Sequence, residues 1–360
     1  MRRSPRSTSS IPVGETYAGA GVDIVAGEQA VERIKARMRA TFRPEVVGDV
    51  GGFGGLFAFD AGRWQRPVLV SSTDGVGTKA AVAWQAGRLE TIGLDLVAMC
   101  VDDVVTHGAE PLFLLDYLAV GRLDPRQVEQ IVGGVAEGCQ HAGCALIAGE
   151  MAEHAGVMEP GHFDLAGFAV GVVERDRLVT GESVRPGDRL VGLVSPGLRC
   201  NGYSLARRVL LDLAGRSLDG PAWDGAHHSL ADELLRPSVI YAPAVVALCR
   251  SVAVGAIAHI TGGGLPANLA RVLPRGCDAV VEVGAWETPR IFVEIQRLGP
   301  VAAAEMARVF NLGIGMVVVV RAADVFKTHD VLRSCGVESI DLGKVVAGDG
   351  GVRLVPATEV

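Results

Sequence analysis

The sequence predicts an α/β fold, and three observations support this prediction. Apolar residues make up 49% of the chain, glycines number 47 and only 21% of the residues are charged, a composition typical of compact, turn-rich α/β proteins. Short β-like runs alternate with segments that have the apolar periodicity of helices. At 360 residues the chain has the length of two ordinary domains, each able to bury its own core.

The first half of the chain is expected to alternate helices with strands. The helix predicted at 27–39 has one apolar face, formed by Ala30, Val31, Ile34 and Met38. Further helices are predicted at 91–107 and 125–142, where Gly108 and Gly143 end them. Strands are predicted at 67–70, 111–115, 144–148 and 164–173.

The second half continues the alternation after a polar, turn-rich join near 174–185. Strands are predicted at 189–194, 256–259 and 317–320, and helices after Leu205, near Pro266 and at 324–334, before short closing strands. We therefore expect an N-terminal domain at 17–176 and a C-terminal α/β domain at 177–360. Residues 1–16 hold several arginines without a following apolar run, which favours a disordered tail over a secretory signal.

The overall charge and the cysteines exclude several classes of protein. A net charge of −7 and a pI near 5.7 argue against a nucleic-acid groove or an anionic-membrane partner. The seven cysteines are odd in number and contain no C-x-x-C pair, which fits free thiols in a reducing cytoplasm. No run approaches 18 apolar residues, so no membrane span is expected.

Residues 71–79, S-S-T-D-G-V-G-T-K, have the chemistry of a polyphosphate site. Glycines allow backbone N–H groups to approach phosphate oxygens, Asp74 can hold a divalent cation, and Lys79 adds a positive charge. The alternative is a strand-to-helix turn with a capping side chain. The segment is not a Walker A loop, because the chain contains no G-x4-G-K-[ST].

Three other segments of the first half contain candidate ligands. Five glycines within residues 48–55 suggest close backbone approach to a ligand, although a hairpin turn would also explain them. Asp102 and Asp103 fall in the last turn of a predicted helix, where the dipole disfavours carboxylates unless a cation compensates; the alternative is a pair of solvated surface acids. Glu150 follows a predicted strand, where ligand groups cluster in α/β folds.

Two loops of the second half resemble ligand-binding loops. Asn201 and Gly202 lie in a polar loop that runs into a helix, and they could form only a turn. Gly262, Gly263 and Gly264 stand between a strand and a helix, a layout that can cradle phosphate at a helix N-terminus.

Seven motifs in order resemble the phosphoribosylformylglycinamidine cyclo-ligase (aminoimidazole ribonucleotide synthetase) family. The resemblance runs from about residue 17 to about residue 355. The motifs are A-G-V-D at 20–23, G-G-F-G at 51–54, T-D-G-V-G-T-K at 73–79, D-x4-G-A-x-P at 103–111, N-G-Y-S-L at 201–205, T-G-G-G at 261–264 and F-N-x-G-x-G-M at 310–316.

This resemblance implies a two-domain subunit, a homodimer and an ATP-dependent reaction. The N-terminal strands would pair across the dimer into a barrel, and the C-terminal α/β domain would contain a mixed sheet. ATP with Mg²⁺ would activate the formyl amide oxygen of formylglycinamidine ribonucleotide. An amidine nitrogen would then close the imidazole ring, with release of ADP and phosphate, in cytoplasmic purine biosynthesis.

The resemblance also implies roles for individual residues. Asp74 and Asp103 look like Mg²⁺ ligands, with Glu150 as a third. Lys35, in a V-x-R-I-K segment, would contact the ATP phosphates. The alternative is that Lys35 is a solvated surface lysine. The nucleotide would be held by Gly52, Gly54, Gly75, Gly77, Thr78 and Lys79. The substrate and its phosphate would be held by Arg199, Asn201, Gly202, Gly262, Gly263 and Gly264. His259 is a candidate for proton transfer or phosphate contact.

The chain departs from the family's usual pattern at four positions. Met151 stands where a threonine is usual, Arg199 and Cys200 replace a histidine and a serine, and Asp102 is often asparagine. These departures leave open an ATP-using paralogue that acts on another amide or phosphate acceptor. A non-catalytic binding protein is a further alternative, against which the clustered charges of Asp74, Asp103 and Lys79 argue.

Overall fold

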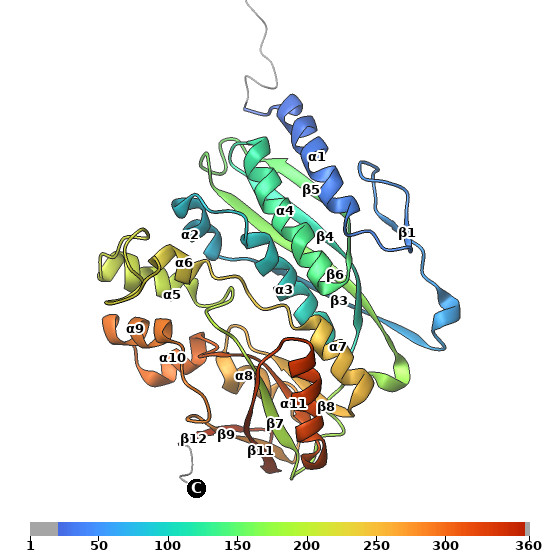
Figure 1. Ribbon diagram of the computed structural model, residues 1–360, viewed down its shortest axis with the longest axis vertical. Helices are drawn as coiled ribbons and strands as arrows, with labels where there is room; N and C mark the ends of the chain where they lie inside the picture. The colour runs from blue at the N-terminus through green and yellow to red at the C-terminus, as the bar shows by residue number, and fades with distance from the viewer. Residues whose placement is uncertain (1–20, 357–360) are drawn as a thin grey trace, which may run out of the picture.

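The chain folds into two α/β domains, each built on one mixed β-sheet (Figure 1). The computed structural model describes residues 21–356, so the tail predicted at 1–16 lies outside the described residues. The predicted α/β class with two domains is confirmed, whereas a barrel that spans a dimer is a property of two chains and stays a prediction.

The N-terminal sheet has the strand order β3-β6-β4-β5. Its strands are β3 (Pro67–Gly75), β6 (Phe163–Glu174), β4 (Glu110–Val120) and β5 (Ala145–Glu153). Strands β3 and β4 pair antiparallel with β6, and β5 pairs parallel with β4. Three helices, α1 (Ile24–Arg39), α3 (Ile92–Val105) and α4 (Pro125–Ala142), cover one face of this sheet (Figure 1).

Local capping explains where these helices begin and end. The predicted start of α1 at Gly27 is three residues late, because the Asp23 carboxylate accepts a hydrogen bond from the Ala26 amide and caps a helix that begins at Ile24. Helix α4 has the predicted bounds. The Asp124 carboxylate accepts a hydrogen bond from the Arg126 amide at its start, Pro125 is its first residue, and Gly143 adopts a left-handed conformation at its end.

Two glycines bring α3 and α4 unusually close together. A Cβ atom on Gly93 would lie 2.1 Å from the Val135 nitrogen, and one on Gly134 would lie 2.3 Å from the Glu90 carbonyl oxygen. Only glycine fits at this crossing. The contact fixes α3, whose last turn contains Asp102 and Asp103.

The remaining elements of the first domain differ from the sequence prediction in detail. Strands β3, β4 and β5 extend several residues beyond their predicted ends, and α2 (Lys79–Ala86) was not predicted. The glycine-rich segment 48–55 joins the short antiparallel strands β1 (Val46–Val47) and β2 (Leu56–Phe57), so it is the loop of a hairpin. The 3₁₀ turns are η1 (Ala61–Arg63) and η2 (Arg175–Arg177).

The C-terminal sheet has the strand order β12-β9-β11-β7-β10-β8. Its strands are β7 (Arg189–Val194), β8 (Val254–His259), β9 (Cys277–Glu282), β10 (Ile314–Val320), β11 (Ser339–Ala347) and β12 (Val352–Val355). The predicted bounds of β7 are confirmed, and β11 is longer than the short closing strand that was expected.

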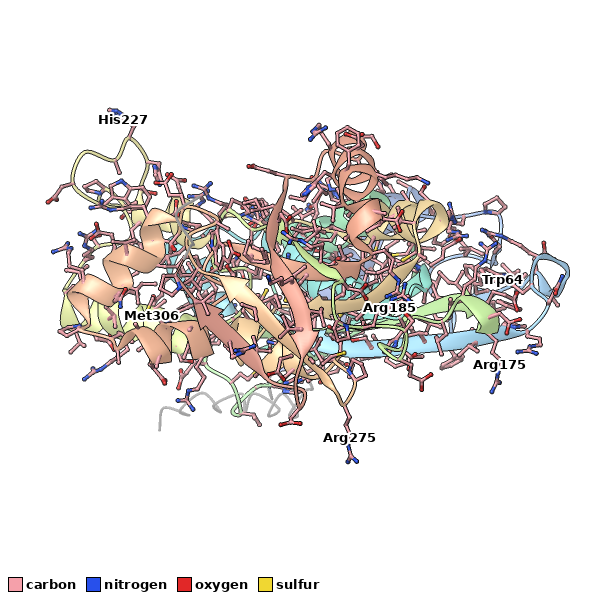
Figure 2. The ribbon with its side chains drawn as sticks, turned by 90° about the horizontal axis from the view of Figure 1, so that it is seen from below. Trp64, Arg175, Arg185, His227, Arg275 and Met306 are labelled. Carbon is pink, nitrogen blue, oxygen red and sulfur yellow. The ribbon has the colours of Figure 1, made fainter. Side chains whose placement is uncertain are left out.

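Helices of the second domain connect these strands and cover the sheet (Figure 1). They are α5 (Tyr203–Arg207), α6 (Leu230–Leu234), α7 (Ala242–Ser251), α8 (Gly264–Ala270), α9 (Arg290–Leu298), α10 (Ala303–Val309) and α11 (Val325–Ser334), with the π-helical segment η3 (Arg208–Leu213) and the turn η4 (Ala322–Asp324). In Figure 2, Trp64 and Arg175 lie together at one end of the molecule, where β3 begins and β6 ends.

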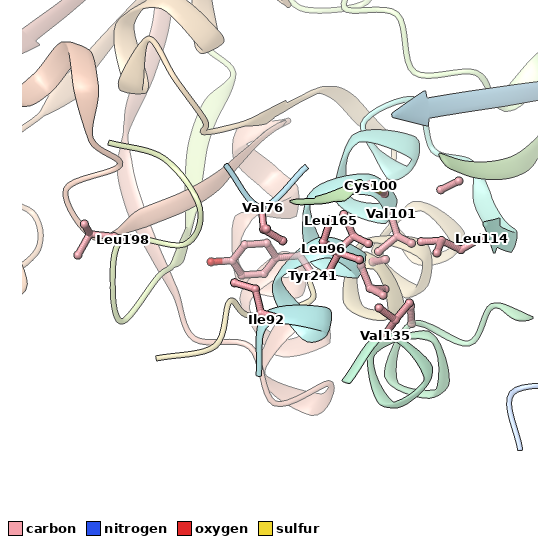
Figure 3. Close-up of a cluster of buried hydrophobic side chains, with 14 of the residues drawn as sticks. Val76, Ile92, Leu96, Cys100, Val101, Leu114, Val135, Leu165, Leu198 and Tyr241 are labelled. Atoms are coloured by element: carbon pink, nitrogen blue, oxygen red, sulfur yellow. The ribbon is translucent and has the colours of Figure 1, made fainter. Parts of the chain in front are cut away.

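One hydrophobic core continues from the first domain into the second. Val76, Leu96 and Leu165 of the first domain gather around Tyr241 of the second (Figure 3). All four side chains are fully buried, and they belong to a single cluster. Because this shared core is large and apolar, the two domains are held in one arrangement.

Candidate active site between the two domains

Strand β3 brings a carboxylate to the domain junction. Side chains alternate between the two faces of a strand, so Ser72 and Asp74 both point to the face that α3 covers, whereas Thr73 points to the other face. The Gly75 amide donates a hydrogen bond to the Asp74 Oδ1 atom at 2.8 Å. This contact holds the carboxylate at the end of the strand.

The last turn of α3 contributes two carboxylates with different surroundings. Asp103 lines a cavity of about 380 Å³ together with Asp74, Thr106, His259 and Thr261. Asp102 is fully buried on the other side of the turn. The alternative of two solvated surface acids is therefore wrong for Asp102.

His259, at the end of β8, joins the two domains at this cavity. Its Nδ1 atom lies 2.7 Å from the Asp103 Oδ1 atom, and the Ser72 hydroxyl donates to the Asp103 Oδ2 atom at 3.0 Å. Both oxygens of Asp103 are thus fixed by hydrogen bonds, one of them from the second domain. The sequence placed His259 and Asp103 in one site, and the structure brings them into contact.

Burial and neighbouring charges shift the pKa values of the two cavity carboxylates in opposite directions. Burial raises the pKa of Asp74, and the negative charge of Asp103 raises it further, against the hydrogen bond from Gly75. Burial also acts to raise the pKa of Asp103, but the contact with His259 and the Ser72 hydrogen bond outweigh it and lower that pKa. Two carboxylates that line one cavity favour a bound cation.

Arg199 does not face the cavity as a phosphate-binding side chain, which corrects the sequence interpretation. It is only 2% exposed, and its Nη2 atom donates to the Asp102 Oδ2 atom at 2.8 Å. Its Nη1 atom donates to the Val239 carbonyl at 2.9 Å, and its guanidinium lies 4.8 Å from the Tyr241 ring centroid. The terminal nitrogens that would clamp a phosphate already have partners inside the protein.

Lys79 requires a similar correction. The sequence placed its ammonium group at the nucleotide, but the side chain is fully buried and its Nζ atom lies 2.6 Å from the Asp95 Oδ2 atom. The Nζ atom also donates to the Arg236 carbonyl oxygen at 2.9 Å. The lysine therefore joins the two domains instead of extending into the cavity.

The glycine-containing motifs of the two domains converge at the same junction. A Cβ atom on Gly202 would lie 2.3 Å from the Phe310 ring, and one on Gly264 would lie 1.8 Å from the Ala307 carbonyl. The Thr78 and Ser204 hydroxyls lie 3.2 Å apart and link the segment 73–79 to the helix α5. The expected strand, triple-glycine and helix order around residue 262 is confirmed.

One predicted substrate-binding residue has a polar atom without a protein partner, and another has open space beside it. The buried Oδ1 atom of Asn201 has no hydrogen-bond partner within residues 21–356. A Cβ atom on Gly262 would meet no atom of these residues within 4 Å, so space is open beside its backbone. The loop itself is held by Asn268, whose amide donates to the carbonyls of Thr261, Gly262 and Gly264.

A second cavity, of about 130 Å³, contains other residues that the sequence assigned to the nucleotide and the metal. Gly52, Gly54 and Glu150 line it beneath the glycine-rich loop, together with Met151 and the buried Asp116. Glu150 therefore does not join Asp74 and Asp103. Within residues 21–356, no group of three or more His, Cys, Asp or Glu side chains is arranged to hold a metal ion.

Lys35 lies on α1, outside the lining of both cavities. Its Nζ atom lies 2.6 Å from the Glu32 carboxylate, a partner one turn away on the same helix. This arrangement is compatible with a solvated surface lysine, and the assignment to ATP stays a prediction.

The sequence analysis assigned no role to Ser72, which donates to Asp103, or to Thr106 and Asn268, which line the main cavity. Ser72 could have been found, because a strand that includes residues 71–75 places it on the same face as Asp74. Thr106 and Asn268 gave no local signal, since they meet the cavity only through the packing of α3 and α8.

Comparison with known proteins places the chain in the class of AIR synthase related proteins. Family models described as AIR synthase related protein, N-terminal domain and C-terminal domain, match residues 60–173 and 185–355. Thiamine-monophosphate kinase from Stenotrophomonas maltophilia has the same fold, with a TM-score of 0.65 at 19% identity over 91% of this chain and 97% of that one. Hydrogenase maturation protein HypE, solved in complex with ATP, aligns with a TM-score of 0.64 at 17% identity over 91% of each chain.

Closer relatives define the particular family. A phosphoribosylformylglycinamidine cyclo-ligase of Myxococcus xanthus is 53% identical over 338 residues, 94% of this chain and 98% of the relative. One of Trichlorobacter lovleyi is 51% identical over 330 residues, 92% of this chain and 94% of the relative. The chain belongs to the phosphoribosylformylglycinamidine cyclo-ligase family.

Proposed function

We propose that the protein catalyses the ATP-dependent cyclisation of formylglycinamidine ribonucleotide to aminoimidazole ribonucleotide, with release of ADP and phosphate. One observation supports this most strongly: the chain is about half identical, over nearly its full length, to cyclo-ligases, and its cavity carboxylates lie at the domain junction. The ring closure forms a C–N bond and expels the former amide oxygen on phosphate.

Asp74 and Asp103 are suited to hold Mg²⁺ together with ATP phosphates. Mg²⁺ is commonly bound by one or two carboxylates plus substrate oxygens, so a cluster of three protein acids is not required. The structure offers two acids that line one cavity, with the Asp103 carboxylate already oriented by Ser72 and His259. When bound, the cation would neutralise charge on the transferred phosphoryl group.

The chain's own residues would bind and orient the reactants around this pair. Gly75, Gly77 and Thr78 leave the end of β3 beside the acids and would approach the phosphates with backbone N–H groups. Asn201, with its unpartnered Oδ1 atom, and the loop Gly262 to Gly264 would hold the ribonucleotide. The loop that contains Gly52 and Gly54 lines the second cavity, so its contact with the nucleotide stays a prediction.

His259 would orient the Asp103 carboxylate and would not serve as a free base. Its Nδ1 atom is engaged with Asp103, which keeps that carboxylate in one orientation while phosphate is transferred. Orientation of this kind lowers the barrier because the reacting groups do not have to reorganise.

We further propose that the open face of the N-terminal sheet forms a homodimer interface. Leu69, Tyr117 and Phe168 point to the face opposite α3 and α4 and are 64%, 41% and 44% exposed. Large apolar side chains gathered on one sheet face mark an interaction surface. The substitution Phe168→Glu should convert the particle measured by light scattering from the mass of two chains to that of one, and a parent that is already monomeric would refute the dimer.

Two further assignments concern the domain boundary and the location of the protein. A domain boundary near residue 176 agrees with the gap between the two matched family models and with sheets drawn from either side of it. No helix within residues 21–356 has the length and apolar content to cross a bilayer. A cytoplasmic location stays a prediction.

An isotope experiment tests the proposed reaction directly. The substrate is labelled with ¹⁸O in its formyl oxygen, and the inorganic phosphate is examined by mass spectrometry. Transfer of the label to phosphate, one atom per product molecule, is the expected result, because the activated oxygen leaves on phosphorus. Consumption of ATP without imidazole formation would favour a paralogue that acts on another acceptor.

A further inference from the structure

A buried charge pair crosses the domain junction directly behind His259. The Arg199 Nη2 atom lies 2.8 Å from the Asp102 Oδ2 atom, and the two side chains are 1% and 0% exposed. The Tyr241 amide donates to the other Asp102 oxygen at 2.9 Å. Since a buried ion pair contributes little stability compared with apolar side chains of similar volume, stability alone is a weak explanation for it.

The Arg199 backbone conformation and its side-chain Nε atom are both energetically unfavourable. Its φ angle is 62°, in the left-handed region that long side chains seldom adopt. The Arg199 Nε atom is buried and has no hydrogen-bond partner within residues 21–356. Both features lower the stability of the folded protein, so the other contacts of Arg199 must offset them.

The position of the guanidinium determines which nitrogen of His259 carries a proton. The Arg199 Nη2 atom lies 3.1 Å from the His259 Nε2 atom. A guanidinium group only donates hydrogen bonds, so Nε2 must be the acceptor and must lack a proton. The proton of the neutral ring is then on Nδ1, where it is donated to the Asp103 Oδ1 atom 2.7 Å away.

We propose that Arg199, anchored by Asp102, is a positioning residue that holds His259 as its Nδ1–H tautomer and thereby fixes the carboxylate of Asp103 in the cavity. The Ser72 hydroxyl holds the second oxygen of Asp103, so two hydrogen bonds, one to each oxygen, set the orientation of that carboxylate. The link from this orientation to ATP turnover rests on the proposed function. The tautomer and the hydrogen bonds do not.

The first test measures the tautomer by NMR at one fixed pH. Protein labelled with ¹⁵N-histidine is recorded, and the variant His259→Gln identifies the His259 signals. The parent should show His259 with its proton on Nδ1. A parent whose His259 carries its proton on Nε2 would overturn the proposal without any variant.

The second test removes the charge pair as a unit. The variant Asp102→Asn/Arg199→Met leaves no unpaired buried charge and keeps an oxygen that accepts from the Tyr241 amide. Its His259 should lose the single Nδ1–H tautomer, and its turnover should fall about 10- to 100-fold, the usual effect of removing a group that orients a metal ligand. An unchanged His259 spectrum would refute the positioning role.

Two comparisons separate positioning from a general loss of structure. Arg199→Lys retains a charged donor and should retain part of the Nδ1–H signature. Lys79→Met/Asp95→Asn neutralises another buried pair, which joins α2 to α3 and does not contact His259, and should leave the His259 tautomer unchanged. If the tautomer shifts as expected but the parent forms no imidazole product, the proposed function fails and the positioning role stands.

Discussion

Removal of the Lys79 ammonium should destabilise the protein far more than it weakens nucleotide binding. Lys79 and Asp95 are both fully buried, with 2.6 Å between Nζ and Oδ2. The substitution Lys79→Met leaves Asp95 as an unpaired buried carboxylate, which typically costs 3–5 kcal/mol, so the free energy of unfolding should fall by roughly 3–5 kcal/mol. The Arg236 carbonyl also loses its donor.

A matched double variant isolates the buried charge from the lost side-chain volume. In Lys79→Met/Asp95→Asn the carboxylate is gone, and the amide oxygen introduced at position 95 can still accept from the Ser238 amide and hydroxyl, which both donate to Asp95 Oδ1 in the parent. The double variant should therefore recover most of the lost stability, with a residual deficit of about 1–3 kcal/mol for the unpartnered carbonyl.

Chemical unfolding and ATP kinetics together decide between the two roles of Lys79. Urea unfolding followed by circular dichroism gives the three free energies, and ATP titration gives the apparent affinity of each folded variant. A single variant within about 1 kcal/mol of the parent, with a strongly weakened ATP affinity, would refute the structural role and restore Lys79 as a phosphate ligand.

Three further outcomes are expected from the structure. Burial raises the pKa of Asp116 to about 7. The parent should therefore lose about 4 kcal/mol of stability as pH rises from about 4 to 7, whereas Asp116→Asn should show no such loss in urea unfolding. Equal pH profiles of parent and variant would contradict this. Gly134→Ala should lower the thermal midpoint, because its Cβ would press on the Glu90 carbonyl, while Gly27→Ala, with open space around it, should raise the midpoint slightly. Lys35→Ala should raise the ATP requirement more than that for the ribonucleotide, and equal constants for variant and parent would return Lys35 to the role of a surface lysine.

The sequence predicted elements well where the deciding interactions are local. Helix α4 has its predicted bounds because its cap, its first-turn proline and its terminal glycine are all adjacent to it. Strand β7 likewise matched its apolar run. The start of α1 was missed because Ile24 and Val25, which follow the cap at Asp23, are exposed and do not belong to the buried face of the helix.

Charged residues were harder to assign because their partners are distant in the sequence. Lys79 sits in a phosphate-like motif, but its partner Asp95 lies on the next helix and its acceptor, the Arg236 carbonyl, in the other domain. Arg199 meets Asp102 across 97 positions of sequence. The pattern of residue types indicated that this region is charged, and only the packing of the two domains shows which charges are neutralised internally.

That same packing explains two departures from the family pattern. The sequence presented Asp102 and Arg199 as separate changes, one adding a negative charge and one a positive charge. The structure places them in direct contact, so their charges compensate each other inside the protein. Neither side chain therefore adds an unpaired charge to the cavity.

The most direct test of the cavity as the active site is the rate at which Asp103→Asn forms the imidazole product. Purified parent and variant are given ATP, Mg²⁺ and formylglycinamidine ribonucleotide, and product one water lighter than the substrate is counted by mass spectrometry. The parent should form it with one ADP per turnover, and the variant, folded as judged by circular dichroism, should be slower by about 100-fold or more. A variant as active as the parent would contradict the assignment of Asp103 and of the cavity that it lines.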